Sequence, residues 1–184
     1  MNNTELELLK IIADMGAETE GAYNIRANGK LADRRITENI NIKTKTDNPG
    51  IDIIIKPNTK GETVHIPVII SETGLTDLVY NDFYIGENCD VTIVAGCGIH
   101  NCGESQSRHD GIHTFYVGKN AKVKYIEKHY GEGDGNGANV MNPTTIANIE
   151  DGGYMEMETA QIKGIDSTDR VTKARLEDNA TIVI

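Results

Sequence analysis

Two nine-residue stretches in the second half of the chain indicate the fold: Phe83-Tyr84-Ile85-Gly86-Glu87-Asn88-Cys89-Asp90-Val91 and Phe115-Tyr116-Val117-Gly118-Lys119-Asn120-Ala121-Lys122-Val123. Two further stretches, at 147–155 and 174–182, align with them without gaps, so the four copies start 32, 32 and 27 residues apart. Each copy is typical of a strand, a tight turn at Asn or Gly, a small residue and a second strand. Asn and Gly suit this turn because they tolerate a positive φ.

Strand–turn–strand units at a regular period indicate a solenoid, because each unit is too thin to bury its own apolar face. The composition agrees: 24 Ile, 10 Val and 17 Thr stand against only 7 Leu, and β-branched side chains favour strands. The connections are too short for helical crossovers, so we expect an all-β fold of the β-helix class. Cys89 occupies the small-residue position of its repeat, which predicts a buried structural thiol.

The first half of the chain predicts one helix followed by strands. An apolar stripe with Thr4 and Glu7 as a capping box and Gly16 as its end predicts a helix within residues 1–20, together with a linker. The helix either packs on the body of the fold or serves as a detachable docking element for a partner. Alternating apolar residues from 36 onward predict strands, and the β-helix domain is expected to span residues 30–184.

Charge and hydropathy exclude several classes of partner. The 184 residues include 18 basic and 28 acidic side chains, a net charge of −10, which argues against nucleic acid as a partner. No apolar run approaches the roughly 18 to 20 residues that span a bilayer. The acidic N-terminus does not resemble a secretory signal. We therefore expect a cytoplasmic protein without membrane insertion, with its three cysteines reduced.

The richest chemistry lies between Gly96 and His113, which we expect to form a loop. The stretch holds two thiols and three imidazoles, the candidate metal ligands Cys97, His100, Cys102, His109 and His113. Thiolate and imidazole suit soft or borderline metals such as zinc, iron and copper. Cys97 and Cys102 are the candidate cofactor ligands. The alternative is a polar loop whose histidines form hydrogen bonds within the solenoid.

The repeat register adds His129 to the candidates. Cys97 follows Cys89 by eight positions, and His129 follows Ala121 by eight. The two residues would therefore occupy equivalent positions on different coils. They would lie about 5 Å apart if 32 residues make one coil, or about twice as far apart if they make two. A Cys and a His on one ladder could share a metal. No catalytic constellation is evident, so we expect a protein that is not an enzyme.

Parts of the sequence resemble the core of the SufB/SufD proteins. The resemblance is carried by Gly96-Cys97 after an apolar strand, His109 to Val117, Gly118-Lys119-Asn120-Ala121-Lys122-Val123-Lys124-Tyr125, Asn142 through Ile149, and Glu150-Asp151-Gly152-Gly153-Tyr154-Met155-Glu156. It is best over roughly residues 75 to 184. The C-terminal helical segment by which that family grips its ATPase has no match here, and Gly98-Ile99-His100 follows Cys97 where the family has Thr-Ala-Pro.

The resemblance implies a right-handed parallel β-helix and a role in building iron–sulfur clusters. It implies a scaffold or scaffold-partner subunit that acts with a SufC-type ATPase and pairs with itself or with a SufB/SufD-like paralogue. Cys97 matches the family's cysteine for sulfur receipt and cluster assembly, and Cys102 and a nearby His would assist. Two alternatives remain: a structural solenoid that presents a surface to a partner without metal, and a metal-binding protein or metal-dependent enzyme that uses the 97–113 segment.

Overall fold

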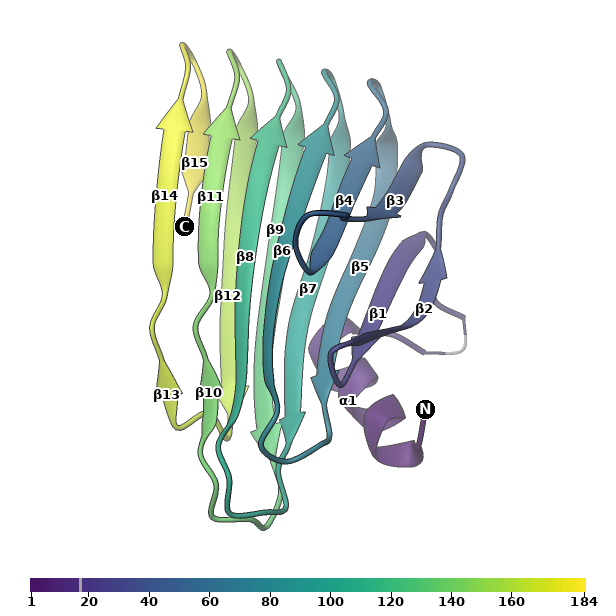
Figure 1. The fold of residues 1–184 in the computed structure, drawn as a ribbon. Helices are drawn as coiled ribbons and strands as arrows, with labels where there is room; N and C mark the ends of the chain where they lie inside the picture. The colour runs from purple at the N-terminus through teal and green to yellow at the C-terminus, as the bar shows by residue number, and fades with distance from the viewer. Residues whose placement is uncertain (17) are drawn as a thin grey trace.

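The computed structural model describes residues 1–16 and 18–184 as a β-solenoid of about four turns, preceded by one helix (Figure 1). The elements in chain order are α1 (Asn3–Ala13), β1 (Ala22–Ala27), β2 (Lys30–Arg35), β3 (Ile40–Thr44), β4 (Gly50–Ile55), β5 (Lys60–Ile70), β6 (Thr76–Ile85), β7 (Asp90–His100), β8 (Ser107–Val117), β9 (Lys122–Glu132), β10 (Asn139–Met141), β11 (Thr144–Ile149), β12 (Tyr154–Lys163), β13 (Ser167–Thr168), β14 (Val171–Leu176) and β15 (Thr181–Val183). The expected all-β solenoid with a short N-terminal helix is confirmed.

Two sheets enclose the core of the solenoid. One sheet has the order β15-β12-β9-β7-β5-β1-β2, and the other has the order β13-β10-β8-β6-β4-β3, with β11 and β14 extending it (Figure 1). Successive coils pair in parallel, whereas β1 with β2 and β3 with β4 pair antiparallel. We call the space between the two sheets the lumen.

One coil corresponds to one 32-residue repeat. Phe83 pairs with Phe115 between β6 and β8, and Phe115 pairs with Ala147 between β8 and β11. The aligned turns adopt the left-handed conformation that the repeat predicts, with φ of 55° at Asn88, 54° at Asn120, 67° at Gly152 and 57° at Asn179. Asn58, with φ of 65°, belongs to an additional coil that the alignment of four copies left out.

The lumen is apolar on the side of these turns. Phe83 and Phe115 are fully buried and stack with ring centroids 4.4 Å apart. Cys89 is buried beside them, and its thiol donates to the carbonyl of Lys56 at 3.1 Å, as expected of a structural thiol. Like residues therefore stack on like residues from coil to coil, which buries large apolar surface in a narrow core.

The helix α1 begins and ends two to three residues earlier than its sequence pattern suggested. Asn2 is the N-cap and forms a capping box with Glu5, in place of the predicted Thr4 and Glu7. Asp14 adopts a left-handed conformation with φ of 53° and ends the helix before Gly16. Both boxes have an acidic residue three positions after a polar cap, so sequence spacing does not separate them.

The helix packs on the outer face of β5, β7 and β9 (Figure 1). Leu8 and Ile12 are fully buried there, whereas Leu6 is 47 % exposed. Gly96 allows the helix to come this close, because a Cβ at that position would lie 2.2 Å from the Ile12 carbonyl oxygen. In the described residues no helix is long and apolar enough to cross a membrane.

Strand pairing begins at Ala22, ahead of the first expected strand. β1 pairs in parallel with β5 and so belongs to the solenoid sheet. Ile36, which we expected to begin the first strand, is 54 % exposed and lies between β2 and β3. The β1–β2 hairpin has many charged residues and few alternating apolar ones, which explains why periodicity did not reveal it.

The close contact between α1 and β7 predicts unequal effects for two glycine substitutions. We expect Gly96→Ala to lower the free energy of unfolding by about 1–3 kcal/mol, because its methyl group meets helix backbone that cannot give way. In Gly98→Ala the new methyl group would lie 3.2–3.4 Å from side-chain atoms of Leu8 and Ile12. This substitution should therefore lower the free energy of unfolding by less. Urea denaturation followed by circular dichroism measures both; equal effects would contradict the observed docking of α1.

Candidate functional site in the solenoid lumen

The segment from 96 to 113 consists mostly of strand, so the expected long loop is wrong. β7 continues to His100 and β8 begins at Ser107, which leaves residues 101–106 as the connection. The glycines of this segment suggested turns, but in the structure they allow close packing of neighbouring elements. Gly96 and Gly98 face α1, and a Cβ on Gly111 would lie 3.1 Å from His109 Nε2 and 3.2 Å from His113 Nε2.

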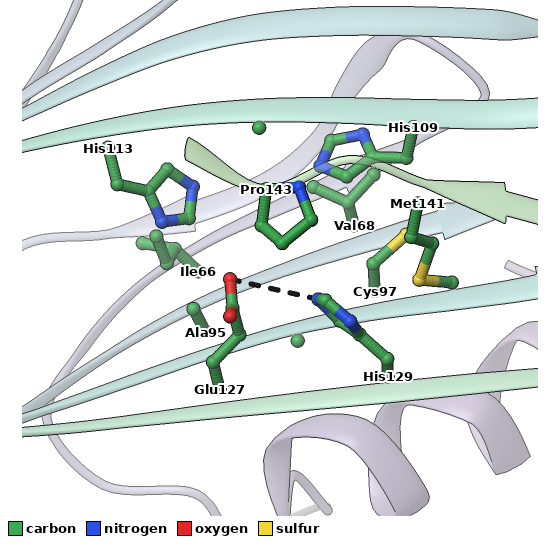
Figure 2. A pocket seen from close by; sticks show the side chains of 12 residues that line it. Ile66, Val68, Ala95, Cys97, His109, His113, Glu127, His129, Met141 and Pro143 are labelled. Carbon is green, nitrogen blue, oxygen red and sulfur yellow. Dashed lines mark ion pairs between the residues drawn. The ribbon is translucent and has the colours of Figure 1, made fainter. Parts of the chain in front are cut away.

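Cys97 and His129 are direct neighbours on adjacent strands. Cys97 on β7 pairs with His129 on β9, which confirms that 32 residues make one coil. Both side chains are buried, with 2 % and 3 % exposed, and both line the same cavity (Figure 2). The alternation of the strands aims them into the lumen, since their neighbours Gly96 and Lys128 belong to the outer face.

His109 and His113 enter the lumen from the opposite sheet. Both lie on β8, two strand positions either side of Gly111, and each is 6 % exposed. His109 Nδ1 lies 3.6 Å from Asp77 Oδ2, and Asp77 accepts three hydrogen bonds from the Arg26 guanidinium at 2.8–3.2 Å. The Arg26–Asp77 ion pair therefore lies next to the His109 imidazole.

A second buried polar group surrounds Glu127. The phenol of Tyr125 donates to Glu127 Oε1 at 3.1 Å, and its oxygen lies 2.7 Å from His113 Nδ1. Arg170 donates to the other oxygen of Glu127, and His129 Nε2 lies 3.7 Å from Oε1. Figure 2 shows Glu127 beside His129 below the Pro143 ring. Glu127 thus links His113 and His129 across the lumen.

The enclosed space among these groups is small. The cavity has a volume of about 10 Å³, which is room for roughly one water molecule. The side chains and glycines around it come from five strands and from the connection between β10 and β11: Ile66, Val68, Ala95, Gly96, Cys97, His109, Gly111, His113, Glu127, His129, Met141 and Pro143. We call the group Cys97, His109, His113, Glu127 and His129 the lumen cluster.

Burial and charge set the protonation of the lumen cluster. Burial, with help from Asp77 and Glu127, raises the pKa of the Cys97 thiol well above its usual value, so the thiol is protonated at neutral pH. Burial lowers the pKa of His113 to about 4, so its imidazole is neutral at pH 7. Burial alone would raise the pKa of Glu127, but His129 and Arg170 outweigh it and lower that pKa.

Two imidazole nitrogens of the lumen cluster lack partners. His109 Nδ1 and His129 Nδ1 are buried and form no hydrogen bond, although buried polar atoms are rarely left unsatisfied. Within 1–16 and 18–184, no three His, Cys, Asp or Glu side chains already stand in a metal-coordinating arrangement. A soft thiol and unpartnered imidazoles nevertheless provide donors that suit a soft or borderline cation.

The remaining two predicted ligands lie outside the lumen. Cys102 is exposed, and its Sγ lies 3.0 Å from Nε2 of His100, which is 30 % exposed. His100 in turn contacts Glu132 at 3.2 Å. The structure therefore divides the six candidates into an inner set of Cys97, His109, His113 and His129 and an outer set of His100 and Cys102.

Several residues of the site were not expected from the sequence. They are the two carboxylates Asp77 and Glu127, their arginines Arg26 and Arg170, and the phenol of Tyr125. A signal existed in β9, where Tyr125, Glu127 and His129 continue the alternation that starts at Val123. The inward positions Glu127 and His129 are polar, and the outward position between Tyr125 and Glu127 is the apolar Ile126, so no contrast in hydropathy marked the inward side.

The neutral His113 predicts a pH-dependent stability. Its pKa is about 4 in the folded protein against 6.5 in the unfolded chain, so the unfolded state binds more protons between these values. Stability should be full above pH 6.5 and decline as the pH falls toward 4. Urea titrations should show His113→Gln losing about 2–3 kcal/mol less than wild type between pH 7 and pH 4.5. Parallel losses in both proteins would contradict the buried, neutral imidazole.

Comparisons with known proteins leave the site to be interpreted from its own geometry. No protein-family model, curated protein or solved structure matches the chain. The comparisons therefore identify no family, and the resemblance to SufB/SufD remains a prediction from the quoted residues.

Proposed function

We propose that the chain is a scaffold or scaffold-partner subunit for iron–sulfur cluster assembly that acts with a SufC-type ATPase and is not itself an enzyme. The observation that carries the proposal is the placement of Cys97 beside His129 in the lumen, where the buried His129 Nδ1 forms no hydrogen bond. The β-solenoid fold is also the one that the SufB/SufD resemblance implies.

The lumen cluster suits a site that takes up its cargo and gives it up again. Because burial keeps Cys97 protonated, a thiolate forms there only when a cation replaces the proton. Iron would gain a thiolate from Cys97 and nitrogen from His129 or His109 after small side-chain rotations. The carboxylates Asp77 and Glu127 are already neutralised by arginines, so they would tune the site without competing as ligands.

The size of the cavity limits the cargo. A volume of about 10 Å³ admits one iron ion, and not an assembled cluster. We therefore assign to the lumen the holding of a single iron, and place cluster completion at a surface shared with a partner subunit. A second copy of the chain or a SufB/SufD-like paralogue would supply that surface.

The edges of the two sheets offer places for such pairing. Within the described residues, β14 and β15 lie at one edge, where Val171, Leu176 and Val183 are 37–45 % exposed. Backbone groups of an edge strand pair readily with a strand from another chain. β2 lies at the opposite edge of its sheet and carries Lys30, Asp33, Arg34 and Arg35, a charge density that discourages such pairing.

A second candidate is a structural solenoid without metal. It is favoured by the ion pairs Arg26–Asp77 and Arg170–Glu127, which already compensate both buried carboxylates. In that case the lumen cluster would tie the two sheets together, and substituting Cys97 would affect packing alone. The two candidates differ in whether Cys97 holds iron.

Anaerobic loading with ferrous iron separates these candidates. We expect the wild-type protein to retain about one iron per chain after desalting, and Cys97→Ser to lose at least 90 % of it, because Cys97 provides the single thiol of the lumen cluster. Cys89→Ser controls for loss of a buried thiol, and Cys102→Ser controls for the exposed thiol. Iron is quantified alongside circular dichroism.

Two results would overturn the proposal. Retention of iron by folded Cys97→Ser would remove the lumen from the function. Absence of iron from the folded wild-type protein would support the structural solenoid.

A further inference from the structure

The exposed end of β7 carries a group of side chains separate from the lumen cluster. His100 is the last residue of β7 and pairs with Glu132, the last residue of β9. Cys102 follows two positions later and is exposed. Cys102 Sγ lies 3.0 Å from His100 Nε2, and His100 Nδ1 lies 3.2 Å from Glu132 Oε1. The three side chains thus form a continuous chain from thiol to imidazole to carboxylate.

The carboxylate fixes which nitrogen of the imidazole faces the thiol. An ionised Glu132 only accepts hydrogen bonds, so His100 Nδ1 donates to it and Nε2 is left as the acceptor toward Cys102. Tyr130 donates to the other oxygen of Glu132 at 3.0 Å. Lys163 lies over the Tyr130 ring, 5.1 Å from its centroid. This is the order of nucleophile, general base and orienting group that activates a cysteine.

The backbone that carries Cys102 is held rigidly by its neighbour Asn101. Asn101 is 2 % exposed. Its amide nitrogen donates at 3.0 Å to the carbonyls of Ser105 and Gly137, and its amide oxygen accepts from Thr73 at 3.0 Å and from the Gly103 N–H at 3.1 Å. The thiol therefore keeps its position relative to His100 although it is open to solvent. Such preorganisation distinguishes a working nucleophile from a chance surface thiol.

The same anchoring indicates the kind of bond the thiol attacks. Acyl transfer requires free backbone N–H groups beside the nucleophile to stabilise an oxyanion. The N–H of Gly103, next to Cys102, is already donated to Asn101. Attack on a sulfur–sulfur bond creates no oxyanion, because the charge leaves on a thiolate. The surroundings therefore favour chemistry at sulfur.

We propose that Cys102, activated by His100 and oriented through Glu132, is a reactive site for small disulfides, which it converts into a mixed disulfide on this chain. The proton of the Cys102 thiol passes to His100 Nε2, and the thiolate attacks one sulfur of R–S–S–R. The bond between Cys102 Sγ and that sulfur forms while the original S–S bond breaks. The leaving thiolate takes the proton from His100, so the products are Cys102–S–S–R and R–SH.

The proposal is independent of the proposed function, because it uses neither Cys97 nor bound iron. Cys97 and Cys89 are buried, so one fast thiol per folded chain is expected. The charged and titratable groups facing the site are Glu132 and Tyr130 on β9, Lys163 beyond Tyr130, and Glu104, which accepts from Asn136 on the neighbouring loop at 3.1 Å. None of these residues is itself substituted in the His100→Gln variant.

The test measures the rate of reaction with 4,4′-dithiodipyridine, a neutral small disulfide. At pH 6.5 the wild-type protein should release one thiopyridone per chain in a fast phase, and Cys102→Ser should show no fast phase. His100→Gln should react at least tenfold more slowly at pH 6.5 and approach the wild-type rate at pH 9, where solvent removes the thiol proton. Glu132→Gln should lie between these two. Mass spectrometry after reaction with oxidised glutathione should find the adduct on Cys102.

Two outcomes would overturn the proposal. His100→Gln that reacts as fast as wild type at pH 6.5 would show an ordinary exposed thiol. A fast phase that persists in Cys102→Ser would place the reactivity on a different cysteine. Circular dichroism and the thiol count in denaturant confirm that each variant is folded and reduced, and the return of rate in His100→Gln at pH 9 excludes a merely structural effect of that substitution.

Discussion

The parallel hydrogen-bonded ladder between successive coils is the constraint from which the rest of the structure follows. Each coil lies one strand spacing, about 5 Å, from the next, so a residue stacks on the residue of the same register one coil away. This stacking fills most of the lumen with matched apolar side chains such as Phe83 and Phe115, whose rings are nearly parallel at 3°. It also places Cys97 on His129, so one register defines both the core and the candidate site.

Charge compensation explains how so polar a cluster is tolerated in a solenoid core. Asp77 and Glu127 are each 3–4 % exposed, and a buried carboxylate without a partner would cost several kcal/mol. Arg26 pairs with Asp77, and Arg170 pairs with Glu127. Both arginine side chains are partly exposed and keep contact with solvent. The imidazoles and the Cys97 thiol are then left around a cavity of about 10 Å³. The Cys102 thiol, five positions after Cys97, is instead exposed to solvent and lies beside His100 as its general base.

The sequence predicted the parts of this structure that depend on local pattern. Repeat spacing and the Asn or Gly turns predicted the solenoid and the equivalent register of Cys97 and His129, but left open whether 32 residues make one coil or two, which the strand pairing decides. Pairings across the lumen, such as His113 with Tyr125 or Glu127 with Arg170, were not predictable because they depend on how two sheets face each other. The glycines of the 96–113 segment make room for α1 and for two histidines. Glycine is also common in turns, so the sequence pattern of this segment predicts a loop.

A cobalt(II) titration of the reduced protein, followed by absorption spectroscopy, tests the soft-metal site in the lumen most directly. Thiolate bound to cobalt gives charge-transfer bands in the near ultraviolet, and the visible bands report the coordination number. We expect thiolate bands in the wild-type protein and in Cys102→Ser, their loss in Cys97→Ser, and weakened cobalt affinity in His129→Gln. Bands that persist in Cys97→Ser and disappear in Cys102→Ser would contradict the assignment of the soft-metal site to the lumen.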